Sequence, residues 1–258
     1  MSKHMYKALL IVAGLAAGQA SANLITNGSF EKNPTSAVVY NGNASNQPIG
    51  SFDDYGSLSN SAHRWAVASS LPGWDLFYGP GVEVQFNGVL GFNAQDGNRY
   101  VELDTHFAYN KPGNSNAGIY QKLTGMQIGA TYELSFWYRS RTTKKDDNGL
   151  GVYWQPNAAL LSQANTFTTV DYDPQEANNK AWTQYKVTLV ASANEMFLGF
   201  GGFGDALYNA NSATNGNGKG ALLDNVSLNL VASPVSAPAT LGLFGLAALG
   251  LMLRRRKA

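Results

Sequence analysis

One predicted strand carries an aromatic ring and a guanidinium group on the same face. In the segment 132–139, period-2 alternation places Trp137 and Arg139 on the polar side and Phe136 and Tyr138 on the apolar side. A flat ring can stack on the C–H face of a sugar, and a guanidinium can bind its hydroxyl oxygens. The pair therefore predicts a carbohydrate-binding surface on the outer face of a sheet.

Three further aromatic residues are candidates for the same chemistry. Tyr153, Trp154 and Trp182 are expected in or beside loops, in segments rich in Asn and Gln. Amide side chains next to an exposed ring are typical of sites that bind sugar hydroxyls. The alternative is that these rings pack beneath long loops or cap a core, so the pattern favours at least one exposed ring without selecting it.

Candidate catalytic groups are few. Glu102, Asp104 and His106 alternate along one predicted strand and share a face. With Asp54 or Asp75 they could form a carboxylate pair for glycoside hydrolysis, or they could bind a metal. The simpler interpretation is a solvated strand face. Because the chain has no Cys and no nucleophile elbow, a non-catalytic protein is favoured.

A carboxylate in the last predicted strand is expected to face the core. Asp224 has the parity of Leu222, Val226 and Leu228. Burial of a carboxylate is costly unless it is paired, hydrogen-bonded or bound to a metal, and carboxylate oxygens suit Ca²⁺. The alternatives are hydrogen bonds from backbone N–H groups and an ion pair with a Lys.

Short strands separated by turn signals must position these groups. One apolar face per strand, without helical periodicity between the strands, indicates an all-β, antiparallel β-sandwich. Long loops are expected at 33–61, 144–165 and 205–218. The predicted strands are 64–69, 82–86, 99–104, 119–123, 132–139, 182–190, 195–200 and 222–230. The G-x-G-x-x-G pattern at 199–204 lacks a following helix and is interpreted as a Gly-rich strand end.

Both ends of the chain have the composition of addressing segments. Lys3 and Lys7 precede the apolar run 8–17, and Ala20 and Ala22 offer small residues to a signal peptidase. This pattern predicts a signal peptide over residues 1–22 and an exported protein. An uncleaved anchor is the alternative.

The other end combines a linker, a short apolar run and a basic terminus. A Pro/Ser/Ala segment precedes the apolar run 241–253, whose helix of about 20 Å is shorter than the membrane core of about 30 Å. This order resembles the PEP-CTERM sorting tail of Gram-negative bacteria, with Pro238-Ala239-Thr240 where that family has Pro-Glu-Pro. The basic residues of the terminus are Arg254, Arg255, Arg256 and Lys257.

The resemblance to sorting tails implies specific partners. It implies an exosortase-like processing enzyme, transient membrane association through 232–258, and a final location at the cell surface or in the extracellular matrix. The alternative is a simple C-terminal membrane anchor.

Charge excludes one class of partner. Of the 18 Lys and Arg residues, six lie in the end segments, and all 17 Asp and Glu residues lie between them. The body therefore has 12 basic and 17 acidic residues, a net charge of −5. Nucleic-acid binding, which requires a basic face, is not expected.

Several blocks of the body resemble galactose-binding-like jelly rolls of the carbohydrate-binding-module type. The blocks are N-L-I-T-N-G-S-F-E at 23–31, L-P-G-W at 71–74, G-N-R-Y-V-E-L-D at 97–104, I-Y-Q at 119–121, Y-E-L-S-F at 132–136 and L-D-N-V-S-L at 223–228. The resemblance implies one jelly-roll domain over residues 23–231. It also implies a structural calcium between Glu31, at the end of the first strand, and Asp224, with the carbonyl oxygen of Gly28 as a further ligand.

These observations predict an exported, non-catalytic protein that binds carbohydrate or associates with a matrix, with extracellular polysaccharide as its partner. One alternative is a structural or adhesive exoprotein without a defined sugar ligand. A weaker alternative is a glycan-active hydrolase.

Overall fold

The computed structural model describes residues 22–34, 38–41, 52–79, 81–105, 115–143, 147–171, 181–203 and 219–233. The predicted signal peptide up to Ser21 and the sorting segment from Pro234 lie outside these residues. The same is true of His106 and of five predicted processing residues, namely Ala20, Pro238, Arg254, Arg255 and Arg256.

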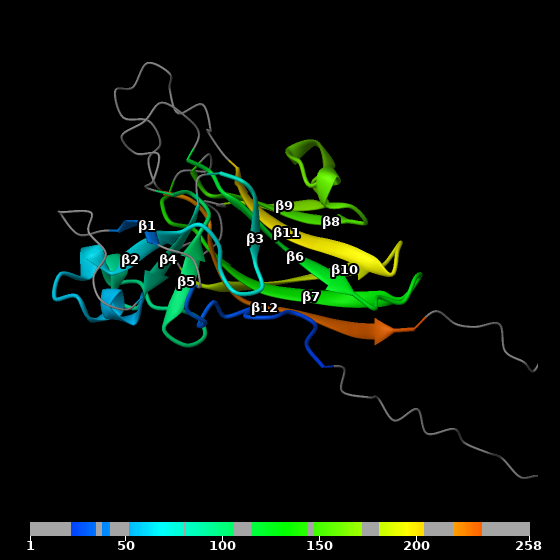
Figure 1. Cartoon of the computed structure of the whole chain (residues 1–258), viewed down its shortest axis with the longest axis horizontal. Coiled ribbons are helices and arrows are strands. Elements are labelled where there is room, and N and C mark those ends of the chain that lie inside the picture. Colours follow the sequence, from blue (N-terminus) through cyan, green and yellow to red (C-terminus); the bar gives the residue numbers. More distant parts are fainter. Residues whose placement is uncertain are drawn as a thin grey trace, which may run out of the picture.

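Two antiparallel sheets form the domain (Figure 1). The larger sheet contains, in spatial order, β1 (Val38–Asn41), β2 (Trp65–Ala68), β4 (Val82–Phe86), β5 (Arg99–Glu102), β12 (Leu222–Ala232), β7 (Thr131–Arg139) and β10 (Thr183–Val190). The smaller sheet contains β3 (Asp75–Tyr78), β6 (Gly118–Thr124), β11 (Glu195–Phe203), β8 (Gly149–Gln155) and β9 (Thr168–Val170). The predicted all-β, jelly-roll-type sandwich is confirmed.

Short 3₁₀ helices connect some of the strands. They are η1 (Phe52–Ser57), η2 (Ser61–His63), η3 (Val89–Gly91), η6 (Ala158–Leu160) and η7 (Gln163–Asn165). Within the described part of the chain, none of the helices has the length and hydropathy of a membrane span.

The core lies between the two sheets and contains the apolar side of each alternating strand. Phe136 on β7 meets Phe200 on β11 edge to face, with ring centroids 5.2 Å apart. Trp74, at the end of the L-P-G-W block, is fully buried and packs against Phe30 and Phe200. Its Nε1 donates to the carbonyl oxygen of Asn27 at 3.0 Å, so the indole is buried without an unsatisfied donor.

Two parts of the predicted layout are wrong. Residues 23–31 form no strand; they run beside β12, and the backbone N–H of Leu24 donates to the carbonyl oxygen of Leu228 at 2.9 Å (Figure 1). The segment 144–165, predicted as a loop, contains β8. Gly149 and Gly151 hide this strand from sequence analysis, and its burial on both faces removes the alternation of polar and apolar residues.

A bulge in β12 reverses the predicted orientation of Asp224. The register against β7 shifts between Asp224 and Ser227, and Asn225 in between has φ = 46°. Asp224 consequently pairs with Trp137, whereas Leu228 pairs with the core residue Leu134. Because paired residues point to the same side of a sheet, Asp224 lies on the outer face of the larger sheet and not in the core.

Trp154 is expected to carry a large share of core stability. Its side chain is 7% exposed, and Nε1 donates to the carbonyl oxygen of Val190 at 2.8 Å. Trp154→Ala should lower the free energy of unfolding by about 3–5 kcal/mol. Phe167→Ala removes a ring that is 49% exposed and should cost about 0.5 kcal/mol or less. Urea unfolding of both variants measures the difference, and equal effects would contradict this assignment of the core.

Candidate functional site

The candidate site is the outer face of the larger sheet, the side turned away from β11. Trp137 on β7 lies on this face between Gln184 on β10 and Asp224 on β12, its direct cross-strand neighbours. Its indole is partly buried, and it makes no hydrogen bond or aromatic ring contact with the described residues. The ring is thus positioned by a rigid strand while its indole N–H stays unused.

Arg139 lies two residues further along the same face and is held against an aromatic ring. Its guanidinium carbon is 4.0 Å from the centroid of Phe92, over which Arg141 also lies, at 5.4 Å. The Nε of Arg139 is buried without a hydrogen-bond partner. Burial lowers the pKa of Arg139, and the nearby Tyr100 opposes the shift. This guanidinium is therefore fixed in place and has an unused donor.

Trp182 joins the same region from the residue before β10. Its Nε1 donates to the carbonyl oxygen of Asn93 at 2.7 Å, and its ring meets Tyr100 edge to face, with centroids 5.6 Å apart. These contacts attach the segment Phe92–Asn98, called here the covering loop, to the sheet. The structure thus brings together three of the five predicted aromatic and cationic residues: Trp137, Arg139 and Trp182.

The other two predicted sugar-binding residues are not exposed and do not lie in loops. Both are in β8. Trp154 is part of the core between the sheets, and Tyr153 is fully buried on the outer face of the smaller sheet, 5.1 Å from the ring of Phe77. The structure does not support either as a stacking surface, because the two faces of β8 are covered.

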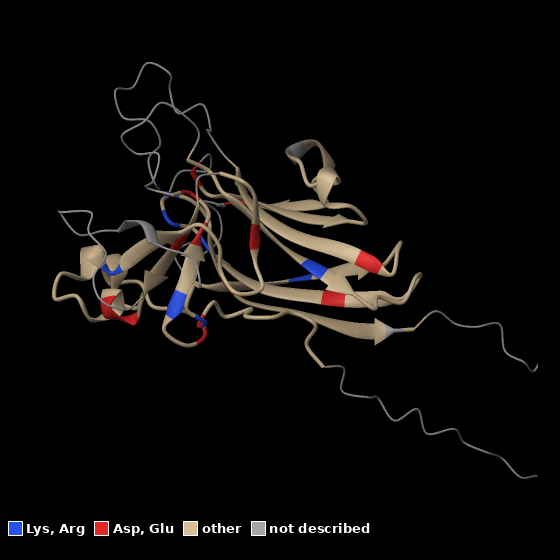
Figure 2. Ribbon diagram, viewed as in Figure 1, with Lys and Arg blue, Asp and Glu red and all other residues tan. Residues whose placement is uncertain are grey.

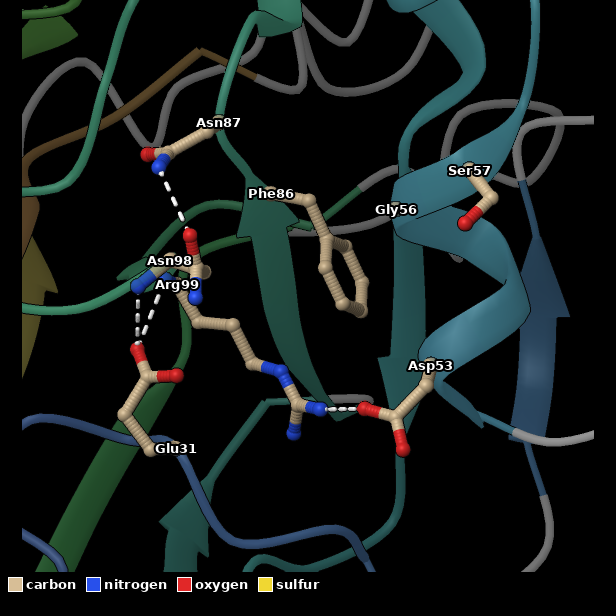
Figure 3. Close-up of a pocket in the computed structure, with 8 residues that line it drawn as sticks. All are labelled: Glu31, Asp53, Gly56, Ser57, Phe86, Asn87, Asn98 and Arg99. Carbon is tan, nitrogen blue, oxygen red and sulfur yellow. Dashed lines mark hydrogen bonds and ion pairs between the residues drawn. The ribbon is translucent and has the colours of Figure 1, made fainter.

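Two carboxylates hold the covering loop and the start of β5. Oδ2 of Asp224 accepts hydrogen bonds from the backbone N–H groups of Gln95 and Asp96, at 2.7 and 3.0 Å. Oε1 of Glu31 accepts from the backbone N–H groups of Asn98 and Arg99, both at 2.8 Å (Figure 3). We call these four hydrogen bonds the carboxylate clasp.

The predicted calcium ligands are compatible with the metal in chemistry but already have partners. Glu31, Asp224 and the Gly28 carbonyl offer the oxygen ligands that Ca²⁺ prefers. Among the described residues, however, no three acidic or His side chains gather as a metal site would require. The Gly28 carbonyl accepts from Val226 N–H at 2.9 Å. Burial raises the pKa of Asp224 to about 7, although backbone N–H groups of Asp96, Asn225 and Gln95 lower it. Calcium therefore stays a prediction.

A pocket of about 340 Å³ lies beside the clasp, between β5 and η1 (Figure 3). Its lining includes Glu31, Asp53, Ser57, Phe86, Asn98 and Arg99. Arg99 is 5% exposed and pairs with Asp53 through Nη2. Arg99 is not among the site residues predicted from the sequence. Its parity in β5 matches that of the core residue Val101, and a cation at a core position is a signal that could have identified it.

The predicted solvated face at Glu102 and Asp104 is wrong. Glu102 is fully buried and accepts from Gln85, from Nε of Arg141 at 3.1 Å and from the backbone N–H of Gly220 at 2.8 Å. Asp104 is 4% exposed. These acids belong to a buried hydrogen-bond network at the edge of the candidate site.

The fold and site define an all-β sandwich protein with a partly exposed aromatic ring on one sheet. At its C-terminus, residues 234–257 match the PEP-CTERM protein-sorting motif. The chain thus carries the sorting motif of an exported protein of Gram-negative bacteria, as the sequence predicted.

Known proteins resemble other parts of the chain. A multifunctional-autoprocessing repeats-in-toxin protein of Vibrio vulnificus is 28% identical over 156 residues, which are 60% of this chain and 2% of the toxin. A solved α-L-arabinofuranosidase, MgGH51 bound to arabinose, has a TM-score of 0.41 at 15% identity, over 81% of this chain and 26% of that one. A solved CBM4 structure has a TM-score of 0.38 at 13% identity, over 80% of this chain and 99% of that one. Similarities of this size do not assign a function.

Chelation distinguishes a calcium site from a hydrogen-bonded clasp. If Glu31 and Asp224 hold Ca²⁺, adding EDTA should lower the melting temperature, since a ligand that binds only the folded state stabilises it. Asp224→Asn should abolish that EDTA effect. If the carboxylate only accepts N–H groups, EDTA should leave the melting curve of the calcium-loaded protein unchanged, which would contradict the metal.

Proposed function

We propose that this protein is a non-catalytic carbohydrate-binding protein of the cell surface or extracellular matrix, and that it binds polysaccharide on the outer face of the larger sheet. The observation that carries the proposal is Trp137, a partly exposed indole with no hydrogen-bond or ring partner among the described residues. Arg139 on the same face adds a fixed guanidinium. Ring and donor together have the chemistry of a sugar-stacking surface.

Charge supports this partner over a polyanion. Lys and Arg residues are few in the described strands (Figure 2): the smaller sheet has Lys122, and the larger sheet has Arg99, Arg139 and Lys186. Two exposed cations are paired across neighbouring strands, Lys122 with Glu195 at 2.8 Å and Lys186 with Glu133 at 3.0 Å. An uncharged polysaccharide requires no basic face, whereas nucleic acid does.

The second candidate is a structural or adhesive exoprotein without a defined sugar ligand. The same partly exposed indole favours it equally if Trp137 contacts another protein of the matrix. A hydrolase is the weaker proposal, because Glu102 has three hydrogen-bond donors and its carboxylate is buried beneath them.

Trp137→Ala should weaken polysaccharide binding by about 1–3 kcal/mol, as for other central aromatic anchors. Stability should change little, because the ring lies outside the core. Affinity electrophoresis in gels containing neutral polysaccharides measures binding, and thermal melting measures stability. Phe167→Ala, an exposed ring by the smaller sheet, is the control and should bind as the unchanged chain does. Undiminished retention of Trp137→Ala would contradict the proposed surface.

The ends of the exported protein are a separate prediction. A signal peptide over residues 1–22 and processing at the sorting motif would leave Asn23 at the start of the chain and remove Arg254 to Lys257. Intact-mass measurement on protein from the culture supernatant tests both ends. A mass that includes the basic tail would favour the simple membrane anchor.

A further inference from the structure

The pocket beside the carboxylate clasp is separate from the Trp137 surface. Arg99, on its floor, pairs with Phe86 across the β4–β5 ladder and has the parity of the core residues of β5, whereas Trp137 is on the outer face of β7. The two places therefore lie on opposite sides of the larger sheet. A ligand bound in the pocket therefore leaves the Trp137 surface unoccupied.

The guanidinium of Arg99 is preorganised but only partly satisfied. Nη2 pairs with Asp53, and the guanidinium carbon lies 5.3 and 5.0 Å from the ring centroids of Phe52 and Phe86. Nη1 is buried and has no hydrogen-bond partner (Figure 3). The ion pair and the two rings therefore hold this guanidinium in one position at the edge of the pocket.

The remaining lining groups offer donors and acceptors together. Glu31 and Asp53 present carboxylate oxygens, Ser57 a hydroxyl and Asn98 an amide, while Phe86 forms an apolar wall. A sugar hydroxyl both donates and accepts, so it matches such a mixed lining. The volume of about 340 Å³ is at the lower end for small-molecule sites, which suits a short saccharide and not a long chain.

The charges select among ligands. Two carboxylates and one guanidinium leave a net charge of −1, which disfavours uronates, phosphates and other anions. The guanidinium in the same pocket disfavours a bare metal ion. Neither of these charge effects disfavours a neutral sugar.

We propose that this pocket binds a single neutral sugar residue, such as the end of a glycan chain, as a second site on the side of the larger sheet opposite the Trp137 surface. The inference rests on the proposed carbohydrate-binding function and adds to it the size and charge class of one ligand. The carboxylate of Asp53, whose side chain is 60% exposed, accepts a hydrogen bond from a sugar hydroxyl, and its ion pair with Arg99 holds it in place.

The test fills the pocket without touching its ion pair. Ser57 is exposed and lines the pocket, and Ser59, also exposed, does not. Ser57→Trp should block the site, whereas Ser59→Trp adds the same bulk outside it. Saturation-transfer NMR and calorimetry on the full-length chain use the methyl glycosides of glucose, galactose, mannose and N-acetylglucosamine as neutral probes, with galacturonate as the anionic probe.

At least one neutral glycoside should bind with a Kd on the order of 1 mM. Ser57→Trp should weaken it by about tenfold or more, while Ser59→Trp and Trp137→Ala should leave it unchanged. Ser57→Trp should melt like Ser59→Trp and keep its Trp137-dependent retention by polysaccharide. If no neutral glycoside binds, if Ser57→Trp binds normally, or if galacturonate binds best, the pocket assignment is overturned. If the unsubstituted protein is not retained by any polysaccharide, the proposed function is overturned as well.

Discussion

The carboxylate clasp is the interaction on which the candidate site depends. A carboxylate that accepts two consecutive backbone N–H groups holds a loop at two points, and charge-assisted hydrogen bonds are stronger than neutral ones. Asp224 holds Gln95 and Asp96 in this way, and Glu31 holds Asn98 and Arg99. With the covering loop fixed, Phe92 lies under Arg139, and the carbonyl oxygen of Asn93 accepts a hydrogen bond from the indole N–H of Trp182.

The covering loop also requires glycine at position 97, since a Cβ on Gly97 would lie 2.5 Å from the Glu31 carboxyl carbon.

The clasp depends in turn on one irregular residue. Asn225 adopts φ = 46°, a region that Asn tolerates better than most residues, and its Nδ2 donates to Oε1 of Gln95 at 2.6 Å. The bulge that it forms turns Asp224 outward and leaves Val226 in the core. A regular strand would have placed this carboxylate between the sheets, away from the N–H groups of the covering loop that satisfy it here.

Strands whose sequence alternates between polar and apolar residues could be predicted, and a strand whose apolar run is interrupted by glycine could not. β4 has the predicted bounds, and β7 and β10 differ by one residue at one end, because alternation marks an inner and an outer side. β8 reads as a loop since Gly149 and Gly151 interrupt its apolar run. Trp137 was placed correctly by parity, whereas parity failed for Asp224 because one extra residue in a strand reverses every position after it. A bulge of this kind is set by packing and is not visible in the pattern.

The two outer faces explain why aromatic content alone does not locate the site. On the smaller sheet, Gly199 and Gly201 leave space that aromatic rings fill: a Cβ on Gly201 would lie 2.2 Å from the Tyr78 hydroxyl oxygen. Tyr153 is buried there against Phe77, so that face forms a small core of its own. On the larger sheet, Trp137 has Gln184 and Asp224 as cross-strand neighbours, and neither provides an apolar surface to cover an indole. A ring with glycine neighbours on adjacent strands can be buried by other rings that fill the free space. A ring with polar neighbours stays partly exposed and is available for stacking.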